Sequence, residues 1–559
     1  MTPRSGGRIL VDQLTVHGVA HVFCVPGESF LAVLDALHDS AIALTVCRQE
    51  GGAAMMAEAH GKLTGRPGIC MVTRGPGAMN AAQGIHIARH DSTPLILFVG
   101  QVERGVRGRE AFQELDYRAV FGSIAKWVTE IDDPARIPEL VARAFHVATS
   151  GRPGPVVIAL PEDMLTQTTA VADAPRYHCI ETSPAPGLMA RFQQALAVAE
   201  RPVAILGGSR WTAAGVSMFA AFADRLALPV LCSFRRQMLF PADHPCFAGD
   251  LGLGVNPSVI ARLKAADLVI LLGCRLSEIP SQGYTLLDRT GSRQTLVHIH
   301  ADAAELGSLY PAQLPIHAAP EDFVKALVDL PPPPATGRSR VQIEEAHRDY
   351  LTWSDPAAIK VPGPLQMGQL MIELQAALPA EAIICNGAGN FATWIHRFWP
   401  FRHYGTQLAT TAGSMGYGVP AAVGAKRLRP EATVVVFAGD GDFLMNGQEF
   451  ATAIQYDLAI LVIVIDNGMY GTIRMHQERE YPGRTVGTEL RNPDFAGFAR
   501  VFGGHGERVE RTEEFAPALR RALGSGKPAI VHCLLDAEAI NPTTTLSLIR
   551  QRALASSGV

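Results

Sequence analysis

Two polar turns in the last third of the sequence could together bind a metal ion and a phosphate group. The apolar run at residues 433–437 is followed by Asp440, which lies between two glycines. The apolar run at 460–465 is followed by Asn467. If the two runs are neighbouring parallel strands, both turns lie at their carboxyl ends, where open α/β sheets bind ligands. The side-chain oxygens suit Mg²⁺, and the glycines allow the backbone to approach a phosphate closely.

A second acidic candidate lies far upstream. Glu50 follows an apolar run at residues 42–47 and precedes a segment rich in small residues. A glutamate at such a place is most often a solvated residue at the start of a helix. Likewise, a single Gly-Asp-Gly triplet is most often an ordinary turn, and Met415, between Gly413 and Gly418, is by itself a core residue. These residues therefore point to chemistry only in combination.

Short apolar runs that alternate with helical patterns are typical of parallel sheets covered by helices. They predict an α/β fold of three doubly wound parallel-sheet domains, the central one Rossmann-like. The strands are expected at residues 42–47, 68–73, 94–100, 203–206, 268–272, 296–299, 433–437 and 460–465, with a crossover helix at 446–456.

Two segments with linker composition divide the chain. Residues 166–186 are rich in Thr, Ala and Pro, and residues 331–337 begin with four consecutive prolines, which fit neither helix nor sheet. The predicted parts are a first domain at 1–165, a central domain at 187–330, a third domain at 345–535 and a C-terminal tail at 536–559.

Composition excludes several other classes of protein. The net charge is −4 over 559 residues and no basic block is present, so we expect no binding to nucleic acid or to an anionic membrane. The nine cysteines have no paired spacing, which favours a reducing cytosol over a disulfide framework. We find no secretory signal pattern and no apolar run of bilayer length, so a cytoplasmic protein is expected.

Together, these motifs resemble the acetolactate-synthase-like branch of the thiamine-diphosphate enzymes. The resemblance covers nearly the whole chain. It implies that the domain at 1–165 is pyrimidine-binding, that the domain at 345–535 is diphosphate-binding and that the tail at 536–559 is a possible active-site lid. Its most specific parts are Gly-Asp-Gly separated by 25 residues from Asn467, and the segments at 75–80, 91–94, 100–102 and 111–114. The family usually has Asn-Asn where this chain has Asp466 and Asn467.

The resemblance implies a role for each motif. Asp440, Asn467 and the backbone carbonyl of Met469 would hold Mg²⁺, which anchors the diphosphate. Glu50 would bind the aminopyrimidine ring and favour the tautomer that removes the proton from the thiazolium carbon, so that the C2 ylide is the nucleophile. Met415 would wedge between the two cofactor rings. The residues expected to bind the cofactor are Glu50, Gly389, Asn390, Gly413, Met415, Asp440, Gly441, Asp442, Asn467 and Met469.

The resemblance also places residues near the substrate and implies an oligomer. Phe112 and Gln113 would lie above the thiazolium, where Gln113 could donate to a substrate oxygen that gains charge; core packing is the alternative for Phe112. In this family Glu50 of one subunit would meet Asp440 of another, so a homodimer or homotetramer with active sites between subunits is expected.

Two departures from acetolactate synthase bear on the reaction. The synthases have Met and Trp where this chain has Thr472 and His476, so a roomier and more polar pocket is expected, with His476 as a proton donor or simply a wall residue. The acidic pair that helps to bind FAD is absent from residues 275–284, although Arg275 is retained. We therefore do not expect FAD.

These departures favour a thiamine-dependent lyase that cleaves a 2-hydroxyacyl-CoA to an aldehyde and formyl-CoA, or runs the reverse condensation. Arg550 and Arg552 in the tail could meet the phosphates of CoA, although a solvated terminal helix is an equal alternative. The second hypothesis is an acetolactate-synthase-type carboligase acting on 2-keto acids. A third, a binding protein without catalysis, is disfavoured because Glu50, Met415, Asp440 and Asn467 occur together.

Overall fold

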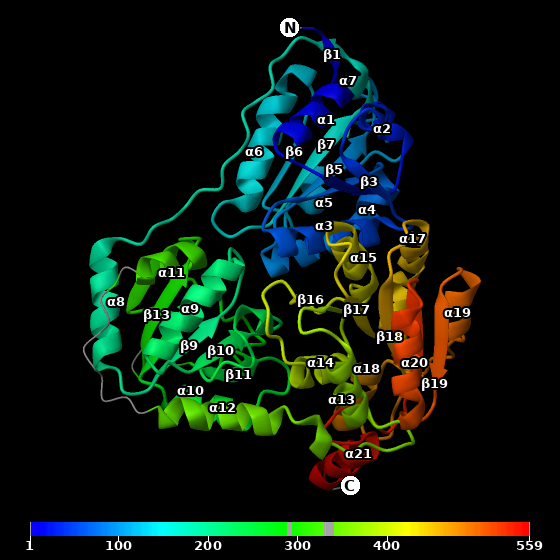
Figure 1. Cartoon of the computed structure of the whole chain (residues 1–559). Helices are drawn as coiled ribbons and strands as arrows, with labels where there is room; N and C mark the ends of the chain where they lie inside the picture. The colour runs from blue at the N-terminus through cyan, green and yellow to red at the C-terminus, as the bar shows by residue number, and fades with distance from the viewer. Residues whose placement is uncertain (1, 288–292, 329, 331–339, 558–559) are drawn as a thin grey trace. The chain divides into compact units, whose positions relative to one another are not determined.

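The computed structural model describes residues 2–287, 293–328, 330 and 340–557. It contains three six-stranded sheets, each wholly parallel, and a small antiparallel pair formed by β1 (Arg4–Ser5) and β8 (Thr168–Thr169) (Figure 1). The predicted α/β fold with three parallel sheets is therefore confirmed. The proline run at 331–337, predicted as a linker, lies outside the described residues.

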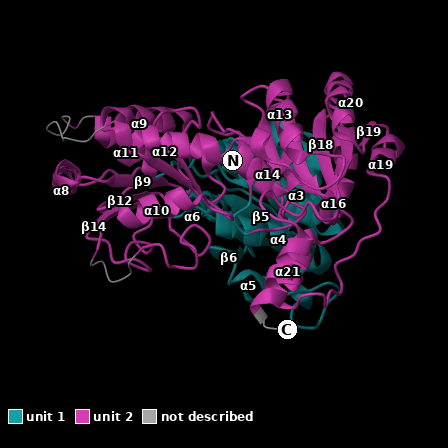
Figure 2. Cartoon of the chain, turned by 90° about the horizontal axis from the view of Figure 1, so that it is seen from below, with its two compact units in different colours: residues 1–180, 410–412, 423–428 teal, residues 181–409, 413–422, 429–559 magenta. Residues whose placement is uncertain are grey.

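Contacts divide the chain into two compact units, which Figure 2 shows in different colours. The first comprises residues 1–180, 410–412 and 423–428, and the second comprises 181–409, 413–422 and 429–559. The first sheet belongs to the first unit, and the second and third sheets belong to the second unit. The domain boundaries drawn from the sequence stay a prediction.

The first sheet has the strand order β3-β2-β4-β5-β7-β6. Its strands alternate with helices, as right-handed parallel crossovers require. Its elements are α1 (Gly6–Val16), β2 (His21–Cys24), α2 (Leu31–His38), β3 (Ala43–Val46), α3 (Glu50–Thr64), β4 (Gly68–Val72), α4 (Gly75–Asp91), β5 (Leu95–Gln101), α5 (Tyr117–Phe121), β6 (Trp127–Glu130), α6 (Ile137–Thr149), β7 (Pro155–Pro161) and α7 (Glu162–Thr166).

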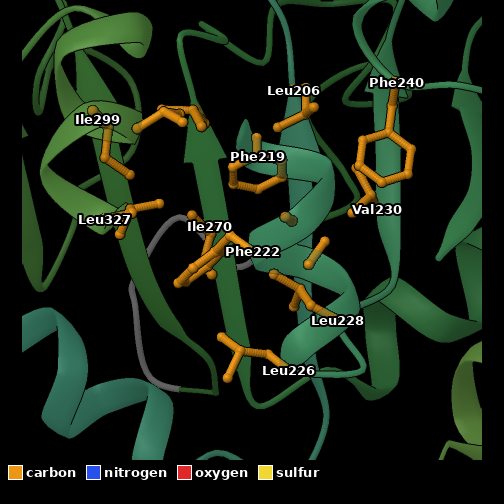
Figure 3. Close-up of a cluster of buried hydrophobic side chains, with 14 of the residues drawn as sticks. Leu206, Phe219, Phe222, Leu226, Leu228, Val230, Phe240, Ile270, Ile299 and Leu327 are labelled. Carbon is orange, nitrogen blue, oxygen red and sulfur yellow. The ribbon is translucent and has the colours of Figure 1, made fainter. Parts of the chain in front are cut away.

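The central sheet has the order β11-β10-β9-β12-β13-β14, the usual Rossmann order. Alternate residues of its strands face two separate cores, because side chains point to opposite faces of a strand. Leu206 and Ile270 belong to one core with Phe219 (Figure 3). Ile205 and Val269 belong to the other core. The elements are α8 (Pro186–Val198), β9 (Pro202–Leu206), α9 (Ala213–Arg225), β10 (Val230–Ser233), β11 (Phe247–Leu251), α10 (Pro257–Ala265), β12 (Leu268–Leu272), β13 (Thr295–His300), β14 (Leu314–His317), α11 (Pro320–Val328) and α12 (Val341–Trp353).

The third sheet has the order β16-β15-β17-β18-β20-β19, which is the topology of the first sheet repeated. The order reverses between β15 and β17, so loops after these strands diverge and leave a crevice for a ligand. The elements are α13 (Met367–Ala377), β15 (Ile383–Asn386), α14 (Ala392–Phe398), β16 (Gln407–Ala409), α15 (Gly418–Leu428), β17 (Val434–Gly439), α16 (Asp440–Asn446), α17 (Phe450–Gln455), β18 (Ile460–Asp466), α18 (Gly471–Glu480), α19 (Phe495–Val501), β19 (His505–Val509), α20 (Thr512–Gly524), β20 (Ala529–Leu534) and α21 (Leu546–Ser557).

The crossover helix predicted at 446–456 is wrong in its bounds. Helix α16 begins at Asp440, directly after β17, and a 3₁₀ turn at Gly447–Glu449 separates it from α17. The Gly-Asp-Gly triplet is therefore a direct strand-to-helix junction rather than a loop. The glycines hid this from the sequence, because glycine is a poor helix former.

Two further expectations concern the whole chain. None of the helices among the described residues is both long enough and apolar enough to cross a bilayer. All nine cysteines are free, and all except Cys179 are buried, as expected for small apolar core residues.

Candidate functional site

A cavity of about 250 Å³ lies in the second unit at the carboxyl ends of β15, β17 and β18. Its position is the point where the strand order reverses, as expected for a ligand site in a doubly wound sheet. Most of the residues expected to bind the cofactor line it, namely Gly389, Asn390, Gly413, Met415, Asp440, Gly441, Asp442, Asn467 and Met469. Four segments of the chain thus meet at one cavity.

The buried carboxylate of Asp442 connects its own segment to two of the others. Its Oδ1 accepts hydrogen bonds from the backbone N–H of Ala388 at 3.1 Å and of Gly416 at 2.9 Å. A Cβ at Gly387 would lie 2.0 Å from this same oxygen, so only glycine fits there. Burial raises the pKa of Asp442 to about 7, although the two backbone donors lower it. The residue is thus better suited to holding loops than to binding a metal.

Asp440 and Asp466 form a buried acidic pair. Nδ2 of Asn492 donates to both carboxylates, at 2.7 Å to Asp440 and 2.8 Å to Asp466. Burial, followed by the charge of Asp466, raises the pKa of Asp440 to about 6. Burial would also raise the pKa of Asp466, but hydrogen bonds, first from His532 and then from Asn492, lower it. A divalent cation would stabilise the ionised form of Asp440 and relieve this repulsion.

The sequence did not point to Asn492 or His532. His532 is almost fully buried, and its Nε2 donates to Asp466 at 2.9 Å. The two residues lie 26 and 66 positions from Asp466, and neither belongs to a motif. Only the pairing of β18 with β20 brings His532 beside Asp466. Asp466 stands where the family usually has Asn, and these two donors satisfy its carboxylate.

The turn after β18 carries Asn467 and Met469, the other residues expected to supply oxygen ligands to the metal. Gly468 has a φ of +67°, a conformation that favours glycine, and its N–H donates to Asp466 at 2.9 Å. The turn is pinned by a bridge between Met469 and Glu489. Beyond it, the Thr472 hydroxyl donates to Asn390 at 3.0 Å. Asn467, Met469 and Thr472 all line the cavity.

These residues fit a diphosphate bound through a divalent cation. Side-chain oxygens from Asp440 and Asn467 are the hard ligands that Mg²⁺ requires. The nearby glycines form a cradle without room for side chains, since a Cβ at Gly439 would lie 2.7 Å from the ring of Phe391. A Cβ at Gly441 would lie 2.6 Å from the ring of Tyr470. Backbone can thus approach the ligand where any side chain would obstruct it.

In the first unit, Glu50 and Gln113 both lie against the start of α4. Glu50 begins α3, and its Oε2 accepts from Nδ2 of Asn80 at 2.9 Å. A Cβ at Gly77 would lie 3.2 Å from Oε1 of Glu50, and the N–H of Gly75 donates to the carbonyl of Gln113 at 3.1 Å. The Gly-Pro-Gly sequence at the start of α4 therefore lies beside the side chain of Glu50 and the backbone of Gln113.

Gln113 has an unusual backbone conformation, and Phe112 has an exposed side chain. Gln113 has a φ of +66°, which is uncommon for a residue with a side chain and often marks a functional position. The side chain of Phe112 is 73% exposed within the chain, so it is not a core residue of its own unit. The catalytic roles of both stay a prediction.

The structure does not bring His476 to the cavity. Its side chain is exposed and lies beside Arg479, whereas Thr472 and Ile473, one turn earlier on α18, line the cavity. Residues four apart share a helix face but lie about 6 Å apart along the axis. The extent of the cavity along α18 cannot be read from residue types alone, and a catalytic role for His476 stays a prediction.

Gly387→Ala is expected to weaken binding of thiamine diphosphate at least about tenfold. The new Cβ would displace the Asp442 carboxylate, and overpacking of this kind costs about 1–3 kcal/mol. Titration calorimetry of the purified variant measures the effect. Gly187→Ala is the matched control, because a Cβ there meets nothing within 4 Å. Equal affinity in the two variants would contradict the role given to Asp442.

Three family models of thiamine pyrophosphate enzymes match the chain. They are the N-terminal TPP binding domain over residues 4–120, the central domain over 189–327 and the C-terminal TPP binding domain over 387–533.

Curated relatives match over almost their full length. The acetolactate synthase isozyme 2 large subunit of Escherichia coli is 31% identical, covering 95% of this chain and 96% of that protein. The acetolactate synthase large subunit of Corynebacterium glutamicum is 31% identical over 96% of this chain and 87% of its own. The probable acetolactate synthase large subunit of Methanocaldococcus jannaschii is 30% identical over 96% and 93%. With three matching domain models in their expected order and relatives that span the chain, this protein belongs to the acetolactate-synthase-like family of thiamine-diphosphate-dependent enzymes.

Proposed function

We propose that this chain is a thiamine-diphosphate- and Mg²⁺-dependent carboligase that joins two 2-keto acids, one of which loses CO₂. The observation that carries the proposal is the convergence of Asp440, Asn467 and the glycine cradle on one cavity. The likeness to acetolactate synthases over nearly the whole chain supports this substrate class. FAD is left out of the proposal because the acidic pair is absent from residues 275–284.

Each candidate residue has a distinct task in this proposal. Asp440, Asn467 and the carbonyl of Met469 hold Mg²⁺, and the backbone around Gly441 and Asn390 surrounds the diphosphate. Met415 props the cofactor rings in a folded arrangement. Thiamine diphosphate, when bound, supplies a nucleophilic carbon and an electron sink.

The first unit supplies the remaining groups in the proposal. Glu50, oriented by its hydrogen bond from Asn80, exchanges a proton with the aminopyrimidine ring. Gln113 donates to the substrate oxygen that gains charge, and Phe112 packs against the substrate. We propose a homodimer or homotetramer in which Glu50 of one subunit acts with Asp440 of another.

The competing hypothesis, which is the first one drawn from the sequence, is that the chain is a 2-hydroxyacyl-CoA lyase. One feature that suggests this reaction is Arg550 in the tail, as a partner for the phosphates of CoA. In the structure Arg550 donates to the buried Glu478 through both Nε and Nη2, so its charge is already engaged. The comparisons also favour the 2-keto acid carboligase. The thioester reaction remains a prediction that one assay separates from the proposal.

Purified protein with thiamine diphosphate and Mg²⁺ is expected to convert pyruvate to acetolactate and CO₂. It is expected to leave a 2-hydroxyacyl-CoA intact. Both products are measured, acetolactate by its conversion to acetoin in acid and the thioester by chromatography. Cleavage of the thioester to an aldehyde without condensation of pyruvate would reverse the choice between the two reactions.

Glu50→Gln is expected to lower kcat by about two orders of magnitude or more, because the amide keeps the shape but cannot exchange the proton. Cofactor affinity should change little, since the diphosphate is bound elsewhere. Steady-state kinetics and titration of the cofactor measure the two quantities.

Glu103→Gln serves as the control for this substitution, because Glu103 lies exposed in the same unit. It should behave as the unaltered enzyme. If Glu50→Gln turned over as fast as this control, Glu50 would have no part in the mechanism.

A further inference from the structure

The C-terminal tail is attached to the chain through a buried carboxylate. Glu478, on α18, is fully buried, and α18 packs against α21. Its Oε2 accepts from Nε of Arg550 at 2.7 Å and from the N–H of Gly483 at 3.0 Å. Its Oε1 accepts from Nη2 of Arg550 and from Nε of Arg474 at 3.2 Å. Both carboxylate oxygens are thus fully engaged by donors from three segments.

This arrangement differs from an ordinary surface ion pair. A carboxylate removed from water is stable only when its lone pairs are satisfied, and a two-point contact with a guanidinium also fixes orientation. The hydrogen bond from Arg550, above all, lowers the pKa of Glu478 to about 2, so the residue stays ionised at any physiological pH. The side chain of Arg550 is itself 37% exposed, so its replacement need not disturb a core.

The segment that leads into α21 forms one wall of the cofactor cavity. Leu535, Ala539 and Ile540 line that cavity together with the residues of the diphosphate site. Ile540 is so close to the start of α18 that its Cδ1 would lie 2.9 Å from a Cβ at Gly471. Ala539 and Ile540 are buried, and the chain beyond them leads into α21.

Further contacts connect the wall to the helix that anchors it. Glu538 accepts from the N–H of Ser547 at 2.8 Å and from its hydroxyl at 2.9 Å, which ties the wall to the start of α21. Nδ2 of Asn541 contacts Sδ of Met475 on α18 at 3.7 Å. A continuous path therefore runs from Glu478 through Arg550 and α21 to Ile540.

We propose that Glu478 is a positioning residue whose ion pair with Arg550 holds the C-terminal segment as a fixed wall of the cofactor cavity and thereby slows the release of thiamine diphosphate. The tail is then a permanent part of the site rather than a phosphate-binding arm. This role does not depend on which carbonyl substrate the enzyme uses.

The test compares three variants of the full-length protein loaded with Mg²⁺ and radiolabelled thiamine diphosphate. Arg550→Met removes the ion pair, and Arg550→Lys keeps the charge but loses the two-point contact. Arg552→Met is the matched control, an exposed arginine two residues along the same helix. Release of label is followed after a chase with unlabelled cofactor, and limited proteolysis reports whether the tail is freed.

Arg550→Met is expected to release the cofactor about tenfold faster, because the variant loses a partly exposed ion pair. Its tail should be cleaved sooner, Arg550→Lys should be intermediate, and Arg552→Met should match the unaltered protein. Unchanged release with a freed tail would show that the wall does not retain the cofactor. An unchanged tail would show that the ion pair does not hold it. Neither readout requires a substrate, so a failed pyruvate assay leaves this test intact.

Discussion

The structure of the site depends on how three aspartates are accommodated where the order of the third sheet reverses. Asp440, Asp442 and Asp466 are all buried, and a buried carboxylate is unfavourable unless it is hydrogen-bonded or paired. Asp442 is satisfied by backbone N–H groups from two other loops, and Asp466 by Asn492 and His532. Asp440 retains a raised pKa, and it is the carboxylate that a cation would stabilise. One of these carboxylates, that of Asp442, therefore holds loops together, and another, that of Asp440, is the one suited to a metal.

This constraint explains why the glycines lie where they do. The loops approach so closely that a Cβ at Gly387, Gly439 or Gly441 would overlap Asp442, Phe391 or Tyr470. The first unit repeats the strand order of the third sheet, and its own glycines bring Glu50 and Gln113 to one helix terminus. In the proposed function, two copies of one topology thus supply different groups. The third sheet supplies the metal and phosphate ligands, and the first sheet supplies the groups for proton exchange.

Much of this arrangement could be predicted from the sequence because parallel strands are read as short apolar runs and their polar ends follow directly. Asp440 and Asn467 were placed together by that reasoning alone, and Asn390 and Met415 by family resemblance. Asn492 and His532 could not be found, because only the folded sheet brings them to Asp466. The start of α16 was missed since its glycines resemble a turn, and His476 was expected at a cavity that ends one helical turn earlier.

The central claim is that thiamine diphosphate binds through a divalent cation at the Asp440–Asn467 site. Titration calorimetry of the cofactor into the purified protein, with Mg²⁺ and then with excess EDTA, tests it most directly. Saturable binding of one cofactor per chain is expected with Mg²⁺, and a loss of affinity of at least about tenfold is expected with EDTA. Equal affinity under the two conditions would contradict it.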